Sequence, residues 1–289
     1  MAVPREIHPS QVIDFSGRTA LLATRHRKEQ VIAPLLAAEL GVKVTVPVEF
    51  DSDQFGTFTR EVPRPGSQFK TARAKALAAL EGSDFSLALA SEGAFGPHPA
   101  IPWLACDREL VLFIDRQHGL EIAGEALSTD TNYRQQTVTT VAAAREFAEQ
   151  VGFPSHGLIV GAEADQPLAK GMTDGPQLEA LVAEQLAQHG QVWLETDMRA
   201  MHNPRRQRVI AAATEDLVRK LQQRCPQCAW PGFDVVRREP GLLCAACGLP
   251  TQGIRRHIYG CTSCGYEMAQ DYPDGRQVID PGQCAFCNP

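Results

Sequence analysis

The chain has 289 residues, of which 44% are hydrophobic and 21% charged, and its formal net charge is −6. This composition excludes disordered, collagen-like and coiled-coil proteins, because the apolar fraction suits a buried core and no short period runs through the chain. Its apolar stretches are too short to span a membrane, and residues 1–17 lack the apolar segment of a signal peptide. The sequence therefore predicts a cytoplasmic protein with one large domain and one small one.

Residues 19–223 alternate between strand-like and helix-like patterns. Short apolar or alternating runs predict strands at 19–24, 42–46, 85–90, 110–114, 119–127, 157–160 and 192–194. Apolar residues at helical spacing predict helices at 28–40, 67–80, 138–151, 177–189 and 204–223. The alternation is typical of a layered α/β domain with a mixed or mostly parallel sheet, which we place at residues 1–223.

Eight of the nine cysteines lie in the last 65 residues, which predicts a tandem zinc-ribbon domain at residues 224–289. They form four Cys-x-x-Cys units: Cys225/Cys228, Cys244/Cys247, Cys261/Cys264 and Cys284/Cys287. Each unit places two sulfurs on one side of a tight turn, and two units together provide the tetrahedral sulfur shell that Zn²⁺ prefers. Four units in series at zinc-ribbon spacing predict two structural Zn²⁺ sites.

Two questions about these cysteines stay open at this point. Iron can use the same ligands, and disulfides would need an oxidising compartment. For the pairing we expect sequential units to join, because residues 233–238 read as a ribbon strand between the first two units. Asp274-Gly275 likewise reads as a hairpin turn between the last two. Interleaved pairing, the first unit with the third, is the alternative.

The charge of the tail does not favour nucleic acid as a partner. Residues 224–289 contain six arginines, six carboxylates and no lysine, and each Cys₄–Zn²⁺ site adds about −2 charges. The metallated tail is therefore acidic, although residues 237–238 and 255–257 form small basic spots. Such a tail is more typical of a folding clamp or a protein contact than of a nucleic-acid grip.

Two turns between a strand and a helix are crowded with cations, at residues 24–28 and 197–206. Positive charge is unfavourable at a helix N-terminus unless an anion binds there. The sequence therefore predicts a phosphate or carboxylate site, with these candidate residues: Thr24, Arg25, His26, Lys28, Arg199, His202 and Arg205. The alternative is that the arginines pair with nearby acids such as Glu29, Glu195 and Asp197.

The catalytic candidates are two acids that follow predicted strands, Glu92 and Asp115. Strand ends are where α/β sheets place their ligand chemistry, and either carboxylate can hold Mg²⁺ against a phosphate or simply cap a loop. The adjacent pair Ser155-His156 is not expected to act together, because neighbouring side chains rarely point at each other. Cys106, which stands apart from the others, is expected to be a small buried apolar residue.

Two resemblances follow from these residues. The whole layout resembles an uncharacterised bacterial family with an α/β domain and a paired zinc ribbon. The matching stretches are residues 23–28, residues 195–204, the four cysteine units and the ending 284–289. That resemblance covers nearly the full chain and implies no activity.

Residues 20–95 are also similar to inosine/xanthosine triphosphate pyrophosphatases, which open with a strand and an Ala-Thr-x-Asn-x-x-Lys phosphate turn. Here Ala23-Thr24 matches, His26 stands at the Asn position and Glu29 at the Lys position, with Lys28 beside it. The Ala- and Lys-rich helix around residues 70–75 and the strand near Glu92 also fit. The resemblance implies a related fold and nucleotide hydrolysis.

Three functions compete on this basis. The first is an enzyme or binding protein for a phosphorylated small molecule, such as a nucleotide, in which case the enzyme would be a hydrolase. The second is a protein- or RNA-binding module that uses the zinc ribbons as its contact surface. The third is purely structural, with the ribbons bracing the last helix of the α/β domain. The sequence does not indicate an oligomeric state.

Overall fold

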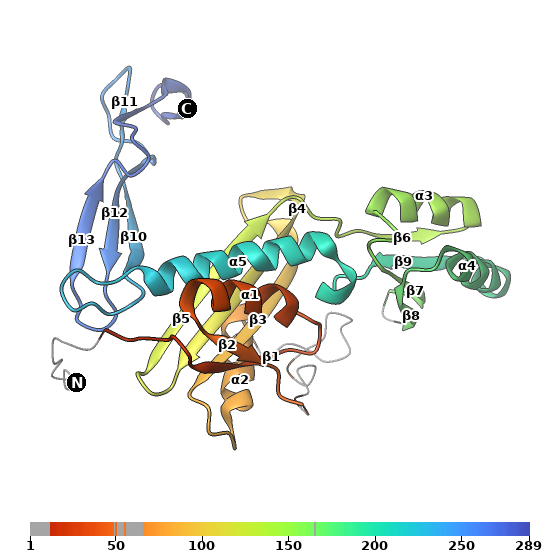
Figure 1. Ribbon diagram of the computed structural model, residues 1–289. Coiled ribbons are helices and arrows are strands. Elements are labelled where there is room, and N and C mark those ends of the chain that lie inside the picture. Colours follow the sequence, from red (N-terminus) through yellow and green to blue (C-terminus); the bar gives the residue numbers. More distant parts are fainter. Residues whose placement is uncertain (1–11, 49, 51–54, 56–65, 165) are drawn as a thin grey trace. The chain divides into compact units, whose positions relative to one another are not determined.

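The computed structural model describes residues 12–48, 50, 55, 66–164 and 166–289 (Figure 1). It has two compact units: the α/β unit, Phe15–Val218, and the ribbon unit, Met1–Asp14 with Arg219–Pro289. The domain boundary predicted at residues 223/224 stays a prediction. Residues 1–11 of the stretch inspected for a signal peptide lie outside the described residues. Within the described part, no helix has the length and apolarity needed to cross a membrane.

A mixed five-stranded sheet forms the centre of the α/β unit, as the alternation of elements predicted. Its strand order is β2-β1-β3-β4-β5. β1 is parallel to β2 and β3, whereas β3, β4 and β5 form an antiparallel meander. The strands are β1 (Thr19–Ala23), β2 (Lys43–Thr45), β3 (Leu87–His98), β4 (Ile101–Asp115) and β5 (Leu120–Ser128).

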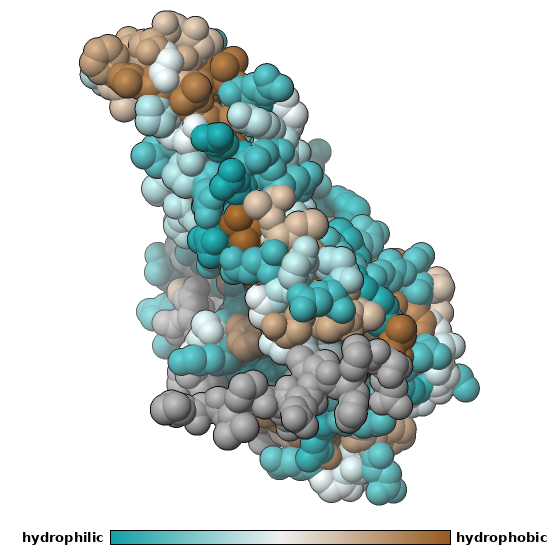
Figure 2. Space-filling view, turned by 90° about the vertical axis from the view of Figure 1, so that its left-hand side faces the viewer, coloured by the Kyte–Doolittle hydropathy of each residue, from teal (hydrophilic) through white to brown (hydrophobic). Residues whose placement is uncertain are grey.

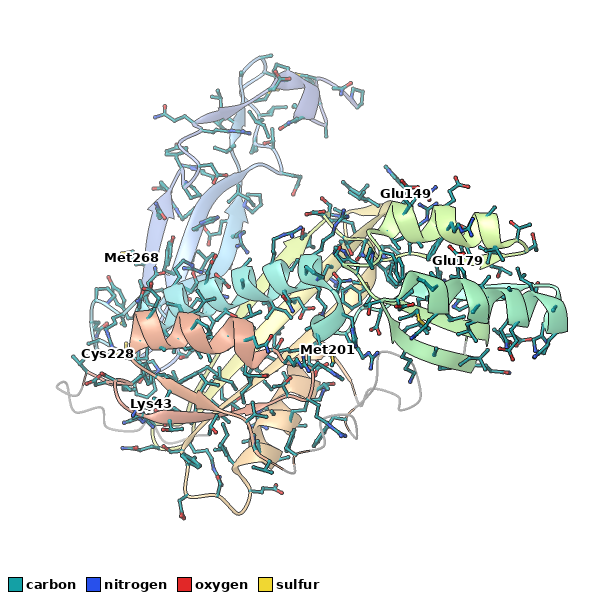
Figure 3. All side chains as sticks on the ribbon, turned by 45° about the vertical axis from the view of Figure 1, so that its right-hand side comes forward. Lys43, Glu149, Glu179, Met201, Cys228 and Met268 are labelled. Carbon is teal, nitrogen blue, oxygen red and sulfur yellow. The ribbon has the colours of Figure 1, made fainter. Side chains whose placement is uncertain are left out.

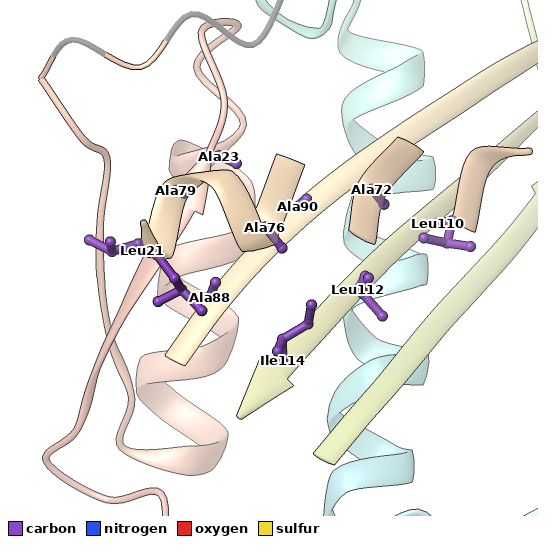
Figure 4. Packing of buried hydrophobic residues seen from close by; sticks show 11 residues of the cluster. Leu21, Ala23, Ala72, Ala76, Ala79, Ala88, Ala90, Leu110, Leu112 and Ile114 are labelled. Carbon is purple, nitrogen blue, oxygen red and sulfur yellow. The ribbon is translucent and has the colours of Figure 1, made fainter. Parts of the chain in front are cut away.

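Helices cover both faces of this sheet: α1 (Glu29–Leu40), α2 (Gln68–Leu80) and α5 (Pro204–Gln222). The alanines of α2 let it pack closely on one face, over side chains that alternate along β1, β3 and β4 (Figure 4). That cluster contains Leu21, Ala23, Ala72, Ala76, Ala79, Leu80, Ala88, Ala90, Leu110, Leu112 and Ile114. α1 and α5 lie on the opposite face (Figures 1 and 4).

A second, antiparallel sheet completes the α/β unit, with the order β6-β9-β7-β8. Its strands are β6 (Gln135–Val138), β7 (Leu158–Glu163), β8 (Gln166–Met172) and β9 (Val192–Thr196). α3 (Val141–Val151) and α4 (Gly175–His189) pack against it, each capped at its start by a side chain, Thr140 and Asp174. A short 3₁₀ helix, Ala200–His202, precedes α5.

The ribbon unit contains two small sheets. The larger is antiparallel, with the order β10-β12-β13, and the smaller pairs β11 with β14 in parallel. The strands are β10 (Asp234–Pro240), β11 (Leu243–Cys244), β12 (Ile254–Gly260), β13 (Glu267–Asp271) and β14 (Val278–Ile279), followed by the 3₁₀ helix Pro281–Gln283. The hairpin predicted at Asp274-Gly275 is wrong, because β13 and β14 belong to different sheets.

Candidate functional site

The eight clustered cysteines form two groups of four that could each hold a metal ion. In each group the four Sγ atoms lie within 4.8 Å of one another. The proximal group is Cys225, Cys228, Cys261 and Cys264, and the distal group is Cys244, Cys247, Cys284 and Cys287. Cys106 lies outside both groups and is buried, as expected.

The expected sequential pairing of these units is wrong, because the structure pairs the first unit with the third and the second with the fourth. The reason is the antiparallel pairing of β10 with β12. Asp234 lies opposite Gly260, so the unit before β10 meets the unit after β12 at one end of the sheet. β10 then carries the chain about 20 Å away at the usual rise per residue. The second cysteine pair therefore lies at β11, which is adjacent to β14 and to the fourth cysteine pair.

The spacing of the sulfurs fits a tetrahedral metal site. Between paired units, the Sγ–Sγ distances are 3.7 Å for Cys225–Cys264 and 3.6 Å for Cys228–Cys261 in the proximal group. In the distal group they are 3.8 Å for both Cys244–Cys287 and Cys247–Cys284. Metal–sulfur bonds of about 2.3 Å at tetrahedral angles give edges of about 3.8 Å. Disulfides would need about 2.0 Å. All four ligands are cysteine thiols, which is the donor set of structural Zn²⁺ sites.

The backbone of each cysteine unit forms the same tight turn. In all four, the N–H of the residue after the second cysteine donates to the carbonyl oxygen of the first. That following residue has a positive φ in three units, at Ala229, Gly248 and Gly265. In the distal group, the backbone N–H groups of Cys247 and Ala246 lower the pKa of Cys244 to about 7. The neighbouring thiols, that of Cys247 first, instead raise the pKa of Cys287 to about 12, so a bound metal ion would be needed to keep all four sulfurs of the group ionised.

The surroundings of the two groups differ. Phe233 stacks between Tyr259 and Tyr266 beside the proximal group and forms a small core with its cysteines. Around the distal group several apolar side chains are exposed, and Phe286 is 71% exposed. The other three are Leu243, Leu249 and Val278. Figure 2 shows this apolar surface at the end of the ribbon unit.

The basic spots of the ribbon unit contain arginines that pair with carboxylates. Arg237 contacts Glu239 and Glu267, and Arg256 contacts Asp271 and Glu239. An arginine that already pairs with a carboxylate attracts a phosphate group more weakly than its formal charge suggests. This surface is therefore more typical of a solvent-exposed sheet with salt bridges than of a phosphate-binding site.

The first cationic turn, residues 24–28, lies where β1 ends and α1 begins. Lys28 occupies the N-cap position of α1 and makes no side-chain cap, which leaves the first turn of the helix without one. Arg27 is exposed and has a positive φ of 56°, a strained conformation for this residue type. Arg25 is exposed and Thr24 is buried, and the Thr24 hydroxyl accepts from the N–H of His26.

In the second cationic turn, residues 197–206, some side chains are buried in the α/β unit and others are exposed to solvent. Asp197 is fully buried and holds Arg199 through both carboxylate oxygens. This is one of the acid pairs named as the alternative to anion binding. Asn203 caps α5 by accepting from the N–H of Arg206. Arg205 instead lies 3.6 Å from Asp130.

The two turns approach each other within the α/β unit. Burial lowers the pKa of His202, and the negative charge of Asp197 partly offsets this effect. The positive charge of Arg27 also acts on His202 and lowers its pKa further. In Figure 3, Met201, next to His202, is drawn near the first turn of α1. Of the predicted anion ligands, Lys28, Arg199 and His202 therefore lie in one region. Arg205 lies near Asp130, and its charge acts on His156.

A cluster of charged side chains is buried under these turns, on the face of the sheet that α1 and α5 cover. Lys28 donates to the carbonyl and hydroxyl oxygens of Ser91 on β3. Arg206 donates to Glu109 on β4 at 2.7 Å, and both side chains are fully buried. Burial, followed by the charge of Arg206, lowers the pKa of Lys28 to about 7. We call Lys28, Ser91, Asp107, Glu109 and Arg206 the buried charged cluster.

The two catalytic candidates from the sequence occupy different places. Glu92 is buried on the α2 face of the sheet, 2.5 Å from Lys75. Asp115 pairs with Leu87 at the start of β3, so it lies at the end of the sheet away from turn 24–28. There it accepts from Arg18 and contacts His118. Among the described residues, groups of three or more potential metal ligands are found only in the cysteine units, so the predicted Mg²⁺ site has no support.

The pair Ser155-His156, which was not expected to act together, does make contact. Ser155 Oγ lies 3.0 Å from His156 Nδ1 and donates to the carbonyl oxygen of Gly152. Because that bond uses the hydroxyl proton, the contact closes the turn after α3 and does not prepare a nucleophile.

Sequence reasoning missed Asp107, Glu109 and Arg206. A signal for the first two was present: extending the predicted strand 110–114 backwards in steps of two places both acids on the face of Val111 and Phe113. Arg206 was read as one of several cations at a helix start. Only the fold shows that it turns inward to Glu109.

Comparison with known proteins adds the family but no activity. A family model described as a domain of unknown function, DUF6671, matches residues 75–289. No curated protein is similar enough to the chain to count as a match. The match begins within α2 and covers β3, β4 and β5 of the first sheet, the whole second sheet and the cysteine-rich tail. It confirms the resemblance to an uncharacterised family, and since it covers well over half of the chain, the protein belongs to the DUF6671 family.

Proposed function

We propose that the α/β unit binds a phosphorylated or otherwise anionic small molecule at the start of α1. The observation that carries this proposal is the exposed Arg27, beside Lys28 and near His202, at a helix N-terminus without a side-chain cap. Arg199, which also acts on His202, already pairs with Asp197. The helix dipole attracts anions at such a place, although the N–H groups of Gln30 and Val31 already donate to the carbonyl oxygens of Arg27 and Lys28. The strained φ of Arg27 supports the same conclusion, because strain of this kind concentrates at functional sites.

Nucleotide hydrolysis is the finer form of this proposal. The similarity of residues 20–95 to inosine/xanthosine triphosphate pyrophosphatases favours it. It is supported by a lysine under the turn whose pKa lies at about 7, where a side chain can exchange a proton at physiological pH. We assign no divalent ion to this site.

In the ribbon unit, we propose that each cysteine group holds one structural Zn²⁺. Four thiolates fill the tetrahedral shell and leave no position for a substrate or an activated water. The ions then supply folding energy to a unit whose own core is small.

Anion binding is tested by isothermal titration of the full chain with inorganic pyrophosphate and with a nucleoside triphosphate. The double variant Arg25→Ala/Arg27→Ala removes two exposed cations of turn 24–28, and we expect it to weaken binding at least tenfold. The control is Arg145→Ala, an exposed arginine on α3 that pairs with Glu179. If both variants bind like the natural chain, or if the natural chain binds neither probe, the proposal fails.

A second function is favoured by one observation, the exposed apolar surface around the distal cysteine group. We propose that this surface contacts a protein rather than RNA, because arginines of the adjacent sheet pair with acids. Co-purified nucleic acid whose binding falls steeply with salt would contradict this choice.

A further inference from the structure

Two carboxylates of the buried charged cluster lie on one face of β4. Asp107 and Glu109 are two residues apart, so their side chains point to the same side of the strand. Asp107 is 1% and Glu109 2% exposed. On β3, the residue paired with Glu109 is Gly93. A glycine has no side chain that could fill the space between the two acids and the helices. Two acids of like charge are therefore enclosed in one water-poor space.

Hydrogen-bond accounting singles out one oxygen on each acid. Glu109 Oε1 accepts from Arg206. Glu109 Oε2 and Asp107 Oδ1 are both buried, and among the described residues neither has a hydrogen-bond partner. Leaving a buried carboxylate oxygen unpaired is costly, typically by about 1–3 kcal/mol or more. One proton placed on either acid turns it into a donor, and the side chain of Glu109 lies within hydrogen-bond reach of Asp107, a contact that helps to raise the pKa of Asp107.

The charges around the pair favour such a proton. The groups that face it are Lys28 at the start of α1, Ser91 on β3 and Arg206 on α5, while Lys75 and Glu92 pair on the other face of the sheet. Burial, followed by the charge of Glu109, raises the pKa of Asp107 to about 8, although Arg206 and Lys28 oppose the rise. A divalent ion would have to enter beside Lys28 and Arg206, against their charge.

We propose that Asp107 and Glu109 share one proton at neutral pH, and that this proton sets the affinity of turn 24–28 for its anion. With the proton present, the pair carries one negative charge against Arg206 and a Lys28 that is only partly protonated at neutral pH. When the proton leaves, a second negative charge appears within the buried charged cluster, where it acts on Lys28 at the end of turn 24–28. This coupling rests on the proposed function, whereas the shared proton itself does not.

The shared proton is tested without any ligand. Infrared difference spectra of the full chain, taken between pH 6 and pH 10, should show the carbonyl stretch of a protonated carboxylic acid that disappears at high pH. Asp107→Asn should remove this band, because the amide copies the shape of the acid but does not titrate. Asp84→Asn, the same change at an exposed loop residue, should leave it. If no such band is lost in Asp107→Asn, the shared proton is excluded, whatever the chain binds.

The coupling is tested with pyrophosphate as the probe. The Kd of the natural chain is divided by that of Asp107→Asn at each pH, which cancels the titration of pyrophosphate itself. If only the protonated pair permits binding, this ratio rises by up to tenfold per pH unit above the titration of the pair. A ratio that stays flat while the infrared band is present overturns the coupling alone. Absence of pyrophosphate binding in both chains overturns the coupling together with the proposed function, and leaves the shared proton standing.

Discussion

At the scale of single residues, Gly93 makes room for the buried ion pair of the α/β unit. A Cβ atom at this position would lie 2.2 Å from Glu109 Oε1 and 2.7 Å from Arg206 Nη2. Both side chains are fully buried, so neither can move away without leaving a charge unpaired in the interior. The requirement for glycine here is one of space.

We therefore predict that Gly93→Ala lowers the free energy of unfolding by about 2–4 kcal/mol, through overpacking and a disturbed buried ion pair. Urea unfolding followed by far-ultraviolet circular dichroism measures it. Gly175→Ala is the matched control, because a Cβ there meets only Phe153 at 3.9 Å. We expect that change to stay within about 0.5 kcal/mol. Equal losses in the two variants would show that Glu109 and Arg206 relax freely around the added methyl group.

Lys28 makes stability depend on pH in the alkaline range. Its pKa is about 7 in the folded chain and 10.5 in the reference state, so between these values the unfolded chain binds more protons. Stability must therefore rise with pH across this window. The cost of burying the charged ammonium is greatest below pH 7 and disappears as the pH passes 10.5.

We predict that hydrogen exchange in β1 and β3 slows, after correction for intrinsic rates, as the pH is raised from about 8.5 to about 10. The increase should approach about 1.4 kcal/mol per pH unit at most. Lys28→Met keeps the apolar stem and removes the titration, so its profile should lack this rise. A parallel rise in the variant would assign the effect to other groups.

At the scale of elements, the sequence pattern located most helices and strands of the α/β unit to within a few residues. It failed where local preference and fold disagree. β3 extends through Pro97 and β4 through Pro102, with Pro99 in the turn between them. These prolines argue against strand in isolation, yet Pro97 pairs with Ala105. β8 was missed because residues 166–172 have no clear alternation. The pairing of the cysteine units depends on the register of β10 with β12, which no local signal encodes.

Double substitutions distinguish the two pairings by zinc content. Cys225→Ser/Cys261→Ser removes ligands from the proximal group only, so we expect one Zn²⁺ per chain to remain. Cys225→Ser/Cys244→Ser removes one ligand from each group and should abolish tight binding of both ions. Elemental analysis of the purified chains measures the ratio of zinc to protein. Sequential pairing would give the reverse pattern, with the second variant retaining one ion.

At the scale of the whole molecule, the two units have different sources of stability. The α/β unit buries large apolar clusters on both of its sheets, whereas the proximal end of the ribbon unit has a core of three buried residues, two of them cysteines. Small domains with so little apolar core depend on metal or disulfides. The division between the units falls within α5, between Val218 and Arg219, so one helix belongs to both.

We predict that a zinc chelator unfolds the ribbon unit and leaves the α/β unit folded. Calorimetry of the full chain should show two transitions, with only the one of the ribbon unit lost on chelation and restored by added Zn²⁺. Hydrogen exchange of β12 should become fast, while that of β3 stays protected. Loss of both transitions together would instead support the structural alternative, in which the ribbons brace the last helix. In that case the stability of the α/β unit, and with it the buried charged cluster that α5 completes through Arg206, would depend on metal.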